Sequence, residues 1–316
     1  MKNRIKYSLL LLCIISKLFL FSADLKERVN FGSNPGNLKL FTFNDSLAKN
    51  KPIVFVLHGC VQNAEKIEEL SDWKKAAIKN DFVVFYPQQK IINNASNCFN
   101  FLLESDINKN GECLSIYQMI RYAIDTLKVD STHVFLYGAS AGACMSEVVC
   151  ANYPWLINTA AICGAIPYRT YAGLKAVNLL GKTQIKPAKE WGDLVRNQNT
   201  FYSGKYPRII LALGTEDFVT DYGYASEIIK QWTSVHAISA QPTDSVLKFE
   251  NNDKVERYVY GKGKETLIFY KIKDVSHTLP VDVGNGEKQG GKDRIFSTDI
   301  NFFLTYYIVK DFGLIK

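Results

Sequence analysis

Short runs of β-branched and aromatic residues recur along the chain and alternate with segments whose apolar residues follow helical spacing. A continuous apolar run of this kind is typical of a strand that is buried on both faces. We expect strands at residues 38–43, 52–57, 81–86, 132–137, 159–164, 208–214 and 266–272. We expect helices around 64–79 and over 112–128, 143–152, 224–233 and 298–307. The alternation predicts an α/β protein with a mainly parallel central sheet and helices on both faces.

Two segments have only weak periodicity. Residues 88–111 are long, irregular and rich in asparagine, and such segments are usually functional, so we expect a loop over the functional edge of the sheet. Residues 167–206 form an insertion that we expect to be a small cap. The sequence contains no repeat, no low-complexity tract and no linker to a second module, so residues 24–316 are predicted to form a single domain.

The first 23 residues have the composition of a leader. A basic head precedes an apolar run that Lys17 interrupts, which leaves the run short of the about 20 apolar residues of a membrane span. We expect residues 1–23 to be a signal peptide of a secreted protein, extracellular or periplasmic, with an uncleaved anchor as the alternative. Cleavage would also remove Cys13 and leave six cysteines. An even number favours disulfides in an exported chain, and buried free thiols are the alternative.

The formal net charge of the chain is +7, but four basic residues lie in the leader and their removal leaves +3. No run of basic residues interleaved with aromatic residues lies elsewhere in the sequence. This small charge does not favour nucleic acid or an acidic membrane surface as a partner. We therefore expect no nucleic-acid partner, and no stable membrane association once the leader is removed.

The pentapeptide Gly138-Ala-Ser-Ala-Gly142 lies between the strand predicted at 132–137 and the helix predicted at 143–152. A G-x-S-x-G sequence arises by chance, but between a strand and a helix it is the pattern of a nucleophile elbow. Small residues flank the serine because strand and helix approach closely at a sharp turn, which exposes the hydroxyl at the carboxyl edge of the sheet. We predict that Ser140 is a nucleophile.

A serine hydroxyl is a weak nucleophile at neutral pH, so it needs a general base, and imidazole titrates in the right range. The chain has four histidines. His58 ends a strand beside turn residues, His133 lies at the far end of the serine's own strand, and His236 follows a helix. His277 remains, on the loop after the last predicted strand. It also satisfies the chain order of serine, acid and histidine that this arrangement requires.

The acid that orients the imidazole should follow a strand between the serine and the histidine. The strand predicted at 208–214 runs directly into Thr-Glu-Asp. Asp217 is therefore the best candidate, with Glu216 and Asp221 as alternatives. Both partners of the serine would then lie at the same edge of the sheet.

Acyl transfer also requires N–H donors for the oxyanion of the tetrahedral intermediate. One is expected from Ala141, the residue after the serine. The other is expected from the loop that His58 holds, at Cys60, with Val61 as the alternative. A disulfide between Cys60 and Cys98 is one of the 15 pairings that six cysteines allow, and it would fix the donor rigidly.

These features follow one another in an order that resembles the polyhydroxybutyrate depolymerase family of α/β-hydrolase esterases, which includes feruloyl and acetylxylan esterases. The similarity covers about residues 38–316. The segments that carry it are Pro52–Val61, Asn97–Asn100, Gly138–Gly142, Cys163–Tyr168, Glu190–Gly192, Gly214–Asp217, Gln231–Trp232, and His277 with Pro280. The resemblance implies an α/β-hydrolase fold and a triad of Ser140, Asp217 and His277, with no metal and no other cofactor.

The same resemblance implies a secreted serine carboxylic ester hydrolase that acts through an acyl-enzyme. Its expected substrates are hydroxyalkanoate oligomers or polyester, or short-chain acyl esters. The alternatives are a carbohydrate esterase of the feruloyl or acetylxylan type and, from another class, a catalytically silent hydrolase-like binding protein. The implied substrate-binding residues are Phe99, Phe101 and Leu279. Family members often carry tryptophan in place of the last two, which predicts a pocket of different shape in this chain.

Overall fold

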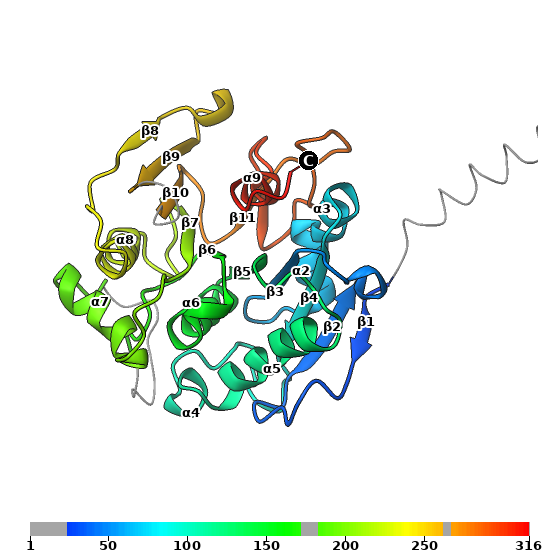
Figure 1. Cartoon of the computed structure of the whole chain (residues 1–316). Helices are drawn as coiled ribbons and strands as arrows, with labels where there is room; N and C mark the ends of the chain where they lie inside the picture. The colour runs from blue at the N-terminus through cyan, green and yellow to red at the C-terminus, as the bar shows by residue number, and fades with distance from the viewer. Residues whose placement is uncertain (1–23, 172–182, 262–266, 316) are drawn as a thin grey trace, which may run out of the picture.

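The computed structural model describes residues 24–171, 183–261 and 267–315. Ten strands of these residues form one sheet (Figure 1). Their order across the sheet is β1-β2-β4-β3-β5-β6-β7-β10-β9-β8. The bounds are β1 Lys26–Arg28, β2 Lys39–Phe43, β3 Ile53–Leu57, β4 Val83–Gln88, β5 Val134–Ala139, β6 Thr159–Cys163, β7 Arg208–Gly214, β8 Asp244–Val246, β9 Val255–Tyr260 and β10 Leu267–Ile272. The predicted leader, residues 1–23, lies outside the described residues.

The centre of the sheet is parallel and both edges are antiparallel. Strands β4, β3, β5, β6, β7 and β10 run in the same direction, whereas β2 and β1 on one edge and β9 and β8 on the other pair antiparallel with their neighbours. The mainly parallel sheet confirms the prediction. Strands β1, β8 and β9 were not predicted, because they are short or partly exposed and lack the continuous apolar runs of the centre.

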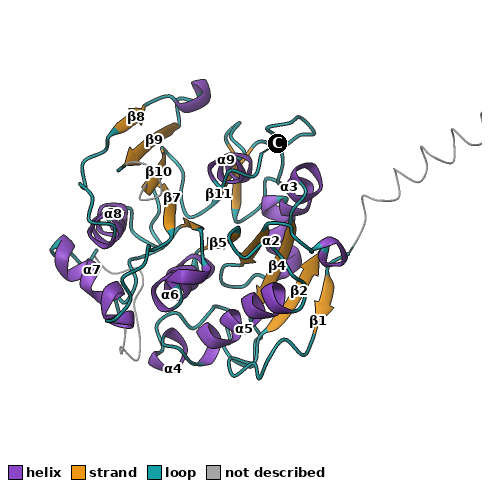
Figure 2. Cartoon of the chain, viewed as in Figure 1, coloured by secondary structure: helices purple, strands orange, loops and turns teal. Residues whose placement is uncertain are grey.

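Helices cover both faces of the sheet, as Figure 2 shows. Successive residues of a strand point to opposite faces, so Ile53, Phe55 and Leu57 of β3 join one apolar core while Val54 and Val56 join the other. The first core lies against α4 Glu104–Ile107, α5 Gly111–Asp125, α6 Ala141–Asn152, α7 Ala188–Arg196 and α8 Tyr224–Val235. The second lies against α2 Ala64–Ser71, α3 Trp73–Asn80 and α9 Leu304–Asp311.

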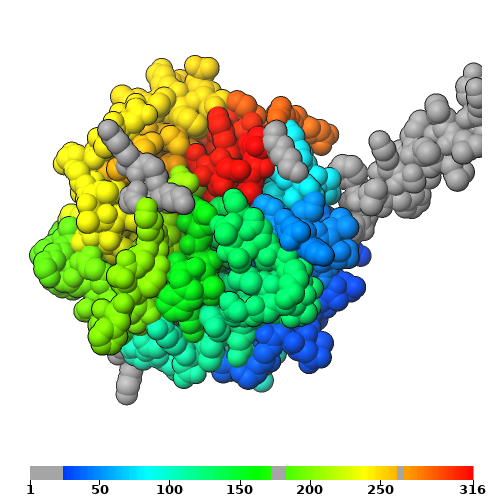
Figure 3. Space-filling view, in the orientation of Figure 1, coloured from blue at the N-terminus to red at the C-terminus, as the bar shows by residue number. Residues whose placement is uncertain are grey.

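Two predicted helices differ from the structure. The helix expected around 64–79 is divided into α2 and α3, because Asp72 adopts a left-handed conformation with φ of 53°. Residues 298–307 were expected to be helical, but Ser297–Asp299 forms strand β12, which pairs in parallel with β11, Leu279–Val281. The last helix, α9, begins only at Leu304 and lies beside α3. In Figure 3 the red surface of the last described residues accordingly lies next to the cyan and blue surface of earlier segments.

The insertion at 167–206 packs beside the sheet through helix α7, which lies along α8. Residues 172–182 of this insertion lie outside the described residues. The buried Trp191 of α7 donates its indole N–H to Glu227 Oε2 of α8 at 2.8 Å. This buried hydrogen bond fixes how the two helices face each other.

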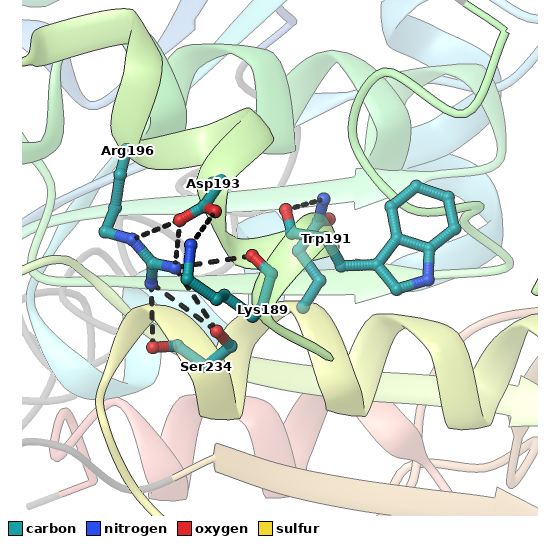
Figure 4. A network of polar contacts seen from close by, with 6 residues as sticks. Lys189, Trp191, Asp193, Arg196 and Ser234 are labelled. Carbon is teal, nitrogen blue, oxygen red and sulfur yellow. Dashed lines mark hydrogen bonds and ion pairs between the residues drawn. The ribbon is translucent and has the colours of Figure 1, made fainter. Parts of the chain in front are cut away.

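A second, half-exposed contact between α7 and α8 is drawn in Figure 4. Arg196 donates from its guanidinium to Asp193 Oδ1 at 2.6 Å and to the carbonyl oxygen of Ser234 at 2.8 Å. Lys189 approaches the other oxygen of Asp193, Oδ2, at 2.6 Å. The arginine thereby ties the end of α7 to the end of α8. No helix of the described chain combines the length and the apolar character needed to cross a membrane.

Glu147 of α6 is a carboxyl group buried in the first core. Its Oε1 accepts a hydrogen bond from Trp232 Nε1 of α8 at 2.9 Å, while its Oε2 has no hydrogen-bond partner among the described residues. Burial raises the pKa of Glu147 to about 8, against the lowering effect of the Trp232 hydrogen bond. The native protein therefore keeps this carboxyl protonated at pH values where the unfolded chain ionises it.

This titration predicts how stability depends on pH. Because the folded pKa lies above the unfolded value, the free energy of unfolding should fall as pH rises from about 4.5 to about 8. The variant Glu147→Gln cannot ionise, so its loss of stability between pH 5 and pH 8 should be smaller by about 2 kcal/mol or more, at about 1.4 kcal/mol per pKa unit. Urea denaturation at both pH values measures this difference. The exposed Glu65→Gln is the control, and equal pH dependence of wild type and Glu147→Gln would contradict the prediction.

Candidate active site

A cavity of about 240 Å³ opens at the carboxyl ends of the parallel strands. Ser140, Asp217 and His277 all line it. The rest of its wall is mainly apolar and includes Phe101, Cys144, Ile166, Val219, Leu279 and Phe296. None of the described residues between 167 and 206 lines the cavity, so the described part of the insertion lies beside the site.

Ser140 stands alone between β5 and α6 in a strained backbone conformation, with φ of 53° and ψ of −121°. Its backbone N–H donates to the carbonyl oxygen of Cys163, at the end of the neighbouring strand, at 2.7 Å. A Cβ atom on Gly138 would lie 2.3 Å from the carbonyl oxygen of Gly142, and one on Gly142 would lie 2.3 Å from that of Leu57. Only glycine fits at both places, which explains the spacing of the pentapeptide.

His277 joins the serine to the aspartate. Its Nε2 lies 2.8 Å from Ser140 Oγ and its Nδ1 lies 2.7 Å from Asp217 Oδ2. The imidazole packs against Gly164, where a Cβ atom would come within 2.8 Å of His277 Cε1. With Nδ1–H donating to the carboxylate, Nε2 is free to accept the proton of the serine hydroxyl.

Asp217 is held by the loop that follows β7, and its side chain is 1% exposed. Its Oδ1 accepts from the backbone N–H groups of Val219 at 2.9 Å and Thr220 at 2.8 Å, and its Oδ2 accepts from the Thr220 hydroxyl at 2.8 Å. Burial acts to raise the pKa of Asp217, but the interactions with His277 and the hydrogen bonds from Thr220 outweigh it and hold the pKa below its usual value. The carboxylate is therefore ionised at neutral pH.

The structure separates Asp217 from the other acids considered. Glu216 is exposed, and Asp221 instead binds the hydroxyl of Thr183 at 2.6 Å. Two of the other histidines lie in parts of the fold away from the serine. His133 contacts Asp130 at the exposed far end of β5, and His236 ends helix α8.

The backbone N–H groups of Cys60 and Ala141 lie near Ser140, and neither has a hydrogen-bond acceptor among the described residues. Ala141 is the first residue of α6, so its N–H has no acceptor within the helix and lies at the positive end of the helix dipole. The loop of Cys60 lies beside the serine, since a Cβ on Gly59 would be 3.2 Å from Ser140 Cβ. The alternative donor, Val61, already donates its N–H to the carbonyl oxygen of Ser96 at 2.8 Å.

His58 controls the direction of the Cys60 N–H. The backbone N–H of Gln89 donates to His58 Nε2 at 3.1 Å, so the proton of the ring is on Nδ1, which donates to the Gly59 carbonyl oxygen at 2.7 Å. That carbonyl and the Cys60 N–H belong to one planar trans peptide and point in opposite directions. Burial lowers the pKa of His58 to about 4, against the hydrogen bond to Gly59, so the ring stays neutral.

A disulfide joins Cys60 to Cys98, across 38 residues of sequence. This is the pairing that we considered for fixing the Cys60 donor. The remaining cysteines of the described chain, Cys113, Cys144, Cys150 and Cys163, are buried free thiols. The described chain therefore contains both a disulfide and buried free thiols, the two alternatives considered from the sequence.

Two of the three predicted substrate-binding residues line the cavity, and the third does not. Phe101 and Leu279 line the cavity. Phe99 does not line it, so that assignment was wrong: its ring is 1% exposed and packs on the far side of the loop against His58, with ring centroids 4.9 Å apart. In an extended strand, residues two apart point to the same side, but the chain turns at Phe101, so the two rings are not held on one side of the loop.

Sequence reasoning missed two residues that support the site. Thr220 lies three residues after Asp217, which is the spacing of a local side-chain turn and could have been recognised. Gln89 directly follows β4, at the carboxyl edge of the sheet, and this position is the only feature of the sequence that suggests a role for it in the site. In the described part of the chain, no three His, Cys, Asp or Glu side chains are arranged to hold a metal ion.

Comparison with known proteins agrees with this geometry. The sequence model of a family described as "Esterase PHB depolymerase" matches residues 39–186. The chain is 35% identical to "Poly(3-hydroxyalkanoate) depolymerase C" of Paucimonas lemoignei over 291 residues, which is 90% of this chain and 69% of that protein. It is 30% identical to "Acetylxylan esterase" of Coprinopsis cinerea over 271 residues, 82% of this chain and 70% of that protein.

A feruloyl esterase and a solved structure extend the comparison. "Feruloyl esterase B" of Talaromyces funiculosus is 28% identical over 272 residues, which cover 83% of this chain and 75% of that protein. The structure of the acetyl xylan esterase from Aspergillus awamori superposes with a TM-score of 0.73 at 23% identity, over 81% of this chain and 94% of that chain. This likeness concerns the fold, and it confirms the predicted α/β-hydrolase fold.

The disulfide generates a prediction about stability. Replacing Cys60 and Cys98 together by alanine should lower the free energy of unfolding by about 3–4 kcal/mol, the loop-closure entropy expected for a cross-link across 38 residues. Guanidinium denaturation under oxidising conditions measures the loss. Wild type in reductant should approach the double variant, which itself should not respond to reductant. Six titratable thiols, rather than four, in the denatured and unreduced chain from Asp24 onward would contradict the disulfide.

Proposed function

Since the chain belongs to the PHB depolymerase family of esterases, we propose that it is a serine carboxylic ester hydrolase with Ser140 as its nucleophile. The observation that carries this proposal is the pair of hydrogen bonds from Ser140 Oγ to His277 and from His277 to Asp217, beside an apolar cavity. A nucleophile, a base within hydrogen-bonding distance and a group that orients the base are the parts that acyl transfer requires.

The proposed reaction has two stages. Ser140 Oγ forms a bond to the ester carbonyl carbon while His277 Nε2 takes the hydroxyl proton, and the carbonyl electron pair moves to the oxygen. The Cys60 and Ala141 N–H groups bind this oxyanion. When the oxyanion collapses, the bond to the alkoxide breaks and His277 returns the proton to the leaving alcohol. Water, deprotonated by His277, then hydrolyses the acyl-enzyme by the same steps.

Asp217 has a distinct part in this proposal. Its carboxylate accepts from Nδ1–H, which keeps Nε2 in the form that accepts a proton, and its charge stabilises the imidazolium formed in the transition state. The low pKa of Asp217 supports this role, because the group stays ionised throughout the working range of the base.

We infer that the substrate is a hydroxyalkanoate oligomer or polyester, or a short-chain acyl ester. The 35% identity to a poly(3-hydroxyalkanoate) depolymerase supports this choice. The cavity supports this choice too, because it is small and its wall is mainly apolar. The 30% identity to an acetylxylan esterase favours a second candidate, the ester of a sugar.

We also propose that the protein is exported. The composition of residues 1–23 supports this proposal, as does the Cys60–Cys98 disulfide, since disulfides persist mainly in oxidising compartments. Neither nucleic acid nor a stable membrane association enters the proposed activity.

Hydrolysis of p-nitrophenyl butyrate tests the nucleophile and its base. Ser140→Ala and His277→Ala should each lower kcat by at least about 10⁴-fold, as loss of a triad member does elsewhere. The control is His133→Ala, an exposed histidine at the opposite end of β5, which should keep wild-type activity. A well-folded Ser140→Ala that retains turnover, or a folded wild type that resists an active-site fluorophosphonate, would refute the proposal and favour a binding protein.

Parallel substrates test the acyl group. The wild type should hydrolyse hydroxybutyrate trimer with a kcat/KM about tenfold or more above that for methyl ferulate, because the cavity favours small apolar acyl groups. Acetylated xylan provides the sugar ester. Preference for methyl ferulate or acetylated xylan over the trimer would replace the polyester proposal by the carbohydrate-ester one.

A further inference from the structure

Glu112 is a buried carboxyl group that the proposed mechanism leaves without a role. It is the second residue of α5 and is 1% exposed. None of the ion pairs found among the described residues includes it. An ionised carboxyl buried without a cation is expensive in free energy unless hydrogen bonds satisfy its oxygens.

Three hydrogen bonds converge on the Glu112 carboxylate. Gln89 donates from Nε2 to Oε1 at 2.5 Å, Asn100 donates from Nδ2 to the same oxygen at 2.7 Å, and the Asn100 backbone N–H donates to Oε2 at 2.8 Å. All three donors belong to the irregular segment between β4 and α4. The carboxylate therefore ties the start of this segment, at Gln89, to Asn100 near its end.

The first connection to the oxyanion donor passes through Gln89. The side chain of Gln89 binds Glu112, and its backbone N–H binds His58 Nε2 at 3.1 Å. His58 in turn binds the Gly59 carbonyl oxygen at 2.7 Å, which sets the direction of the Cys60 N–H. Each link is a single hydrogen bond between buried groups, so a shift of Gln89 reaches the peptide that carries the donor.

The second connection passes through the disulfide. Asn100 lies two residues after Cys98, which is bonded to Cys60 itself. Gln89 Nε2 also donates to the Cys98 carbonyl oxygen at 3.0 Å, so Gln89 and Glu112 together hold the backbone from the half-cystine to Asn100. Both connections begin at one carboxylate and end at one peptide.

We propose that Glu112 is a positioning residue that holds the Cys60 N–H in the direction required to bind the oxyanion. This inference rests on the proposed function, because the oxyanion forms only if Ser140 attacks an ester. Glu112 does not touch the substrate; it acts through Gln89 and Asn100. The sequence position at the start of α5 also places the carboxylate at the positive end of that helix, which favours its charge.

A carboxylate suits this position because all three partners are donors. An amide offers one oxygen and an NH₂ group, so Glu112→Gln sets a donor against a donor and loses at least one of the three hydrogen bonds. Burial raises the pKa of Glu112 to about 7, the Asn100 and Gln89 hydrogen bonds lower it, and Asp106 of α4 raises it. The neighbouring His58 is neutral and adds no charge.

The test compares Glu112→Gln with a matched control, Glu68→Gln. Glu68 is also buried, accepts from the Tyr86 hydroxyl at 2.6 Å, and has a pKa raised by burial to about 7. It lies on α2, and the hydrogen bonds of its carboxyl group among the described residues go to Tyr86 and Lys74, not to the Cys60 loop. The measured quantities are kcat and KM for p-nitrophenyl butyrate, and the inhibition constant of trifluoromethyl propyl ketone, whose serine adduct carries an oxyanion. Wild type and Ser140→Ala are run beside them.

Glu112→Gln should lower kcat about tenfold or more, with KM within about twofold of wild type, because an oxyanion donor acts only in the transition state. The inhibition constant of the ketone should rise by a similar factor, and Glu68→Gln should change neither. A folded Glu112→Gln with wild-type kcat would overturn the inference while the proposed function stands. A wild type without Ser140-dependent hydrolysis would refute the proposed function, and this inference with it.

A second variant keeps the inference testable if Glu112→Gln does not fold. Asn100→Ala leaves the carboxylate in place and removes one of its donors. It should lower kcat about three- to tenfold at unchanged KM, with the same rise in the ketone inhibition constant. An unchanged kcat in folded Asn100→Ala would count against the role of Glu112, as would a loss confined to KM.

Discussion

The whole site depends on one backbone constraint, the left-handed turn at Ser140 between β5 and α6. This turn is compatible with the fold only because strand, helix and the end of β3 touch one another through glycine. The same closeness brings the loop after β3 beside the serine, so the proposed nucleophile and the proposed donor from Cys60 arise from a single packing arrangement. Strands β6, β7 and β10 then add Cys163, Asp217 and His277 in the order in which they pair.

Burial raises the pKa of an acid and lowers the pKa of a histidine around this turn, and the hydrogen-bond partners of each group oppose that shift. Asp217 stays charged because His277 and Thr220 donate to it. His58 stays neutral because burial lowers its pKa to about 4, and its one donor and one acceptor fix which ring nitrogen carries the proton. Each group is therefore fixed in one protonation state and one orientation, which is what a site with preorganised dipoles requires.

Much of this arrangement could be predicted from the sequence, because the parallel strands are continuous apolar runs and the residues at their ends share one edge. Ser140, Asp217 and His277 could be placed by strand context, chain order and elimination. Phe99 could not be distinguished from Phe101, since the side of a loop on which a ring packs depends on tertiary contacts such as that with His58. The break at Asp72 and the role of Glu112 likewise depend on neighbours far away in the sequence.

The spacing of the site along the chain has a consequence for its synthesis. His277 follows Ser140 by 137 residues, and it reaches the serine only when β10 has paired with β7. At about 5–20 residues per second, a ribosome needs on the order of ten seconds to add that stretch. Contacts of such long range also slow folding, because loop closure precedes the pairing that stabilises it. The strand and turn that carry Ser140 are therefore synthesised well before His277, and under the proposed mechanism the site becomes competent only at this late step.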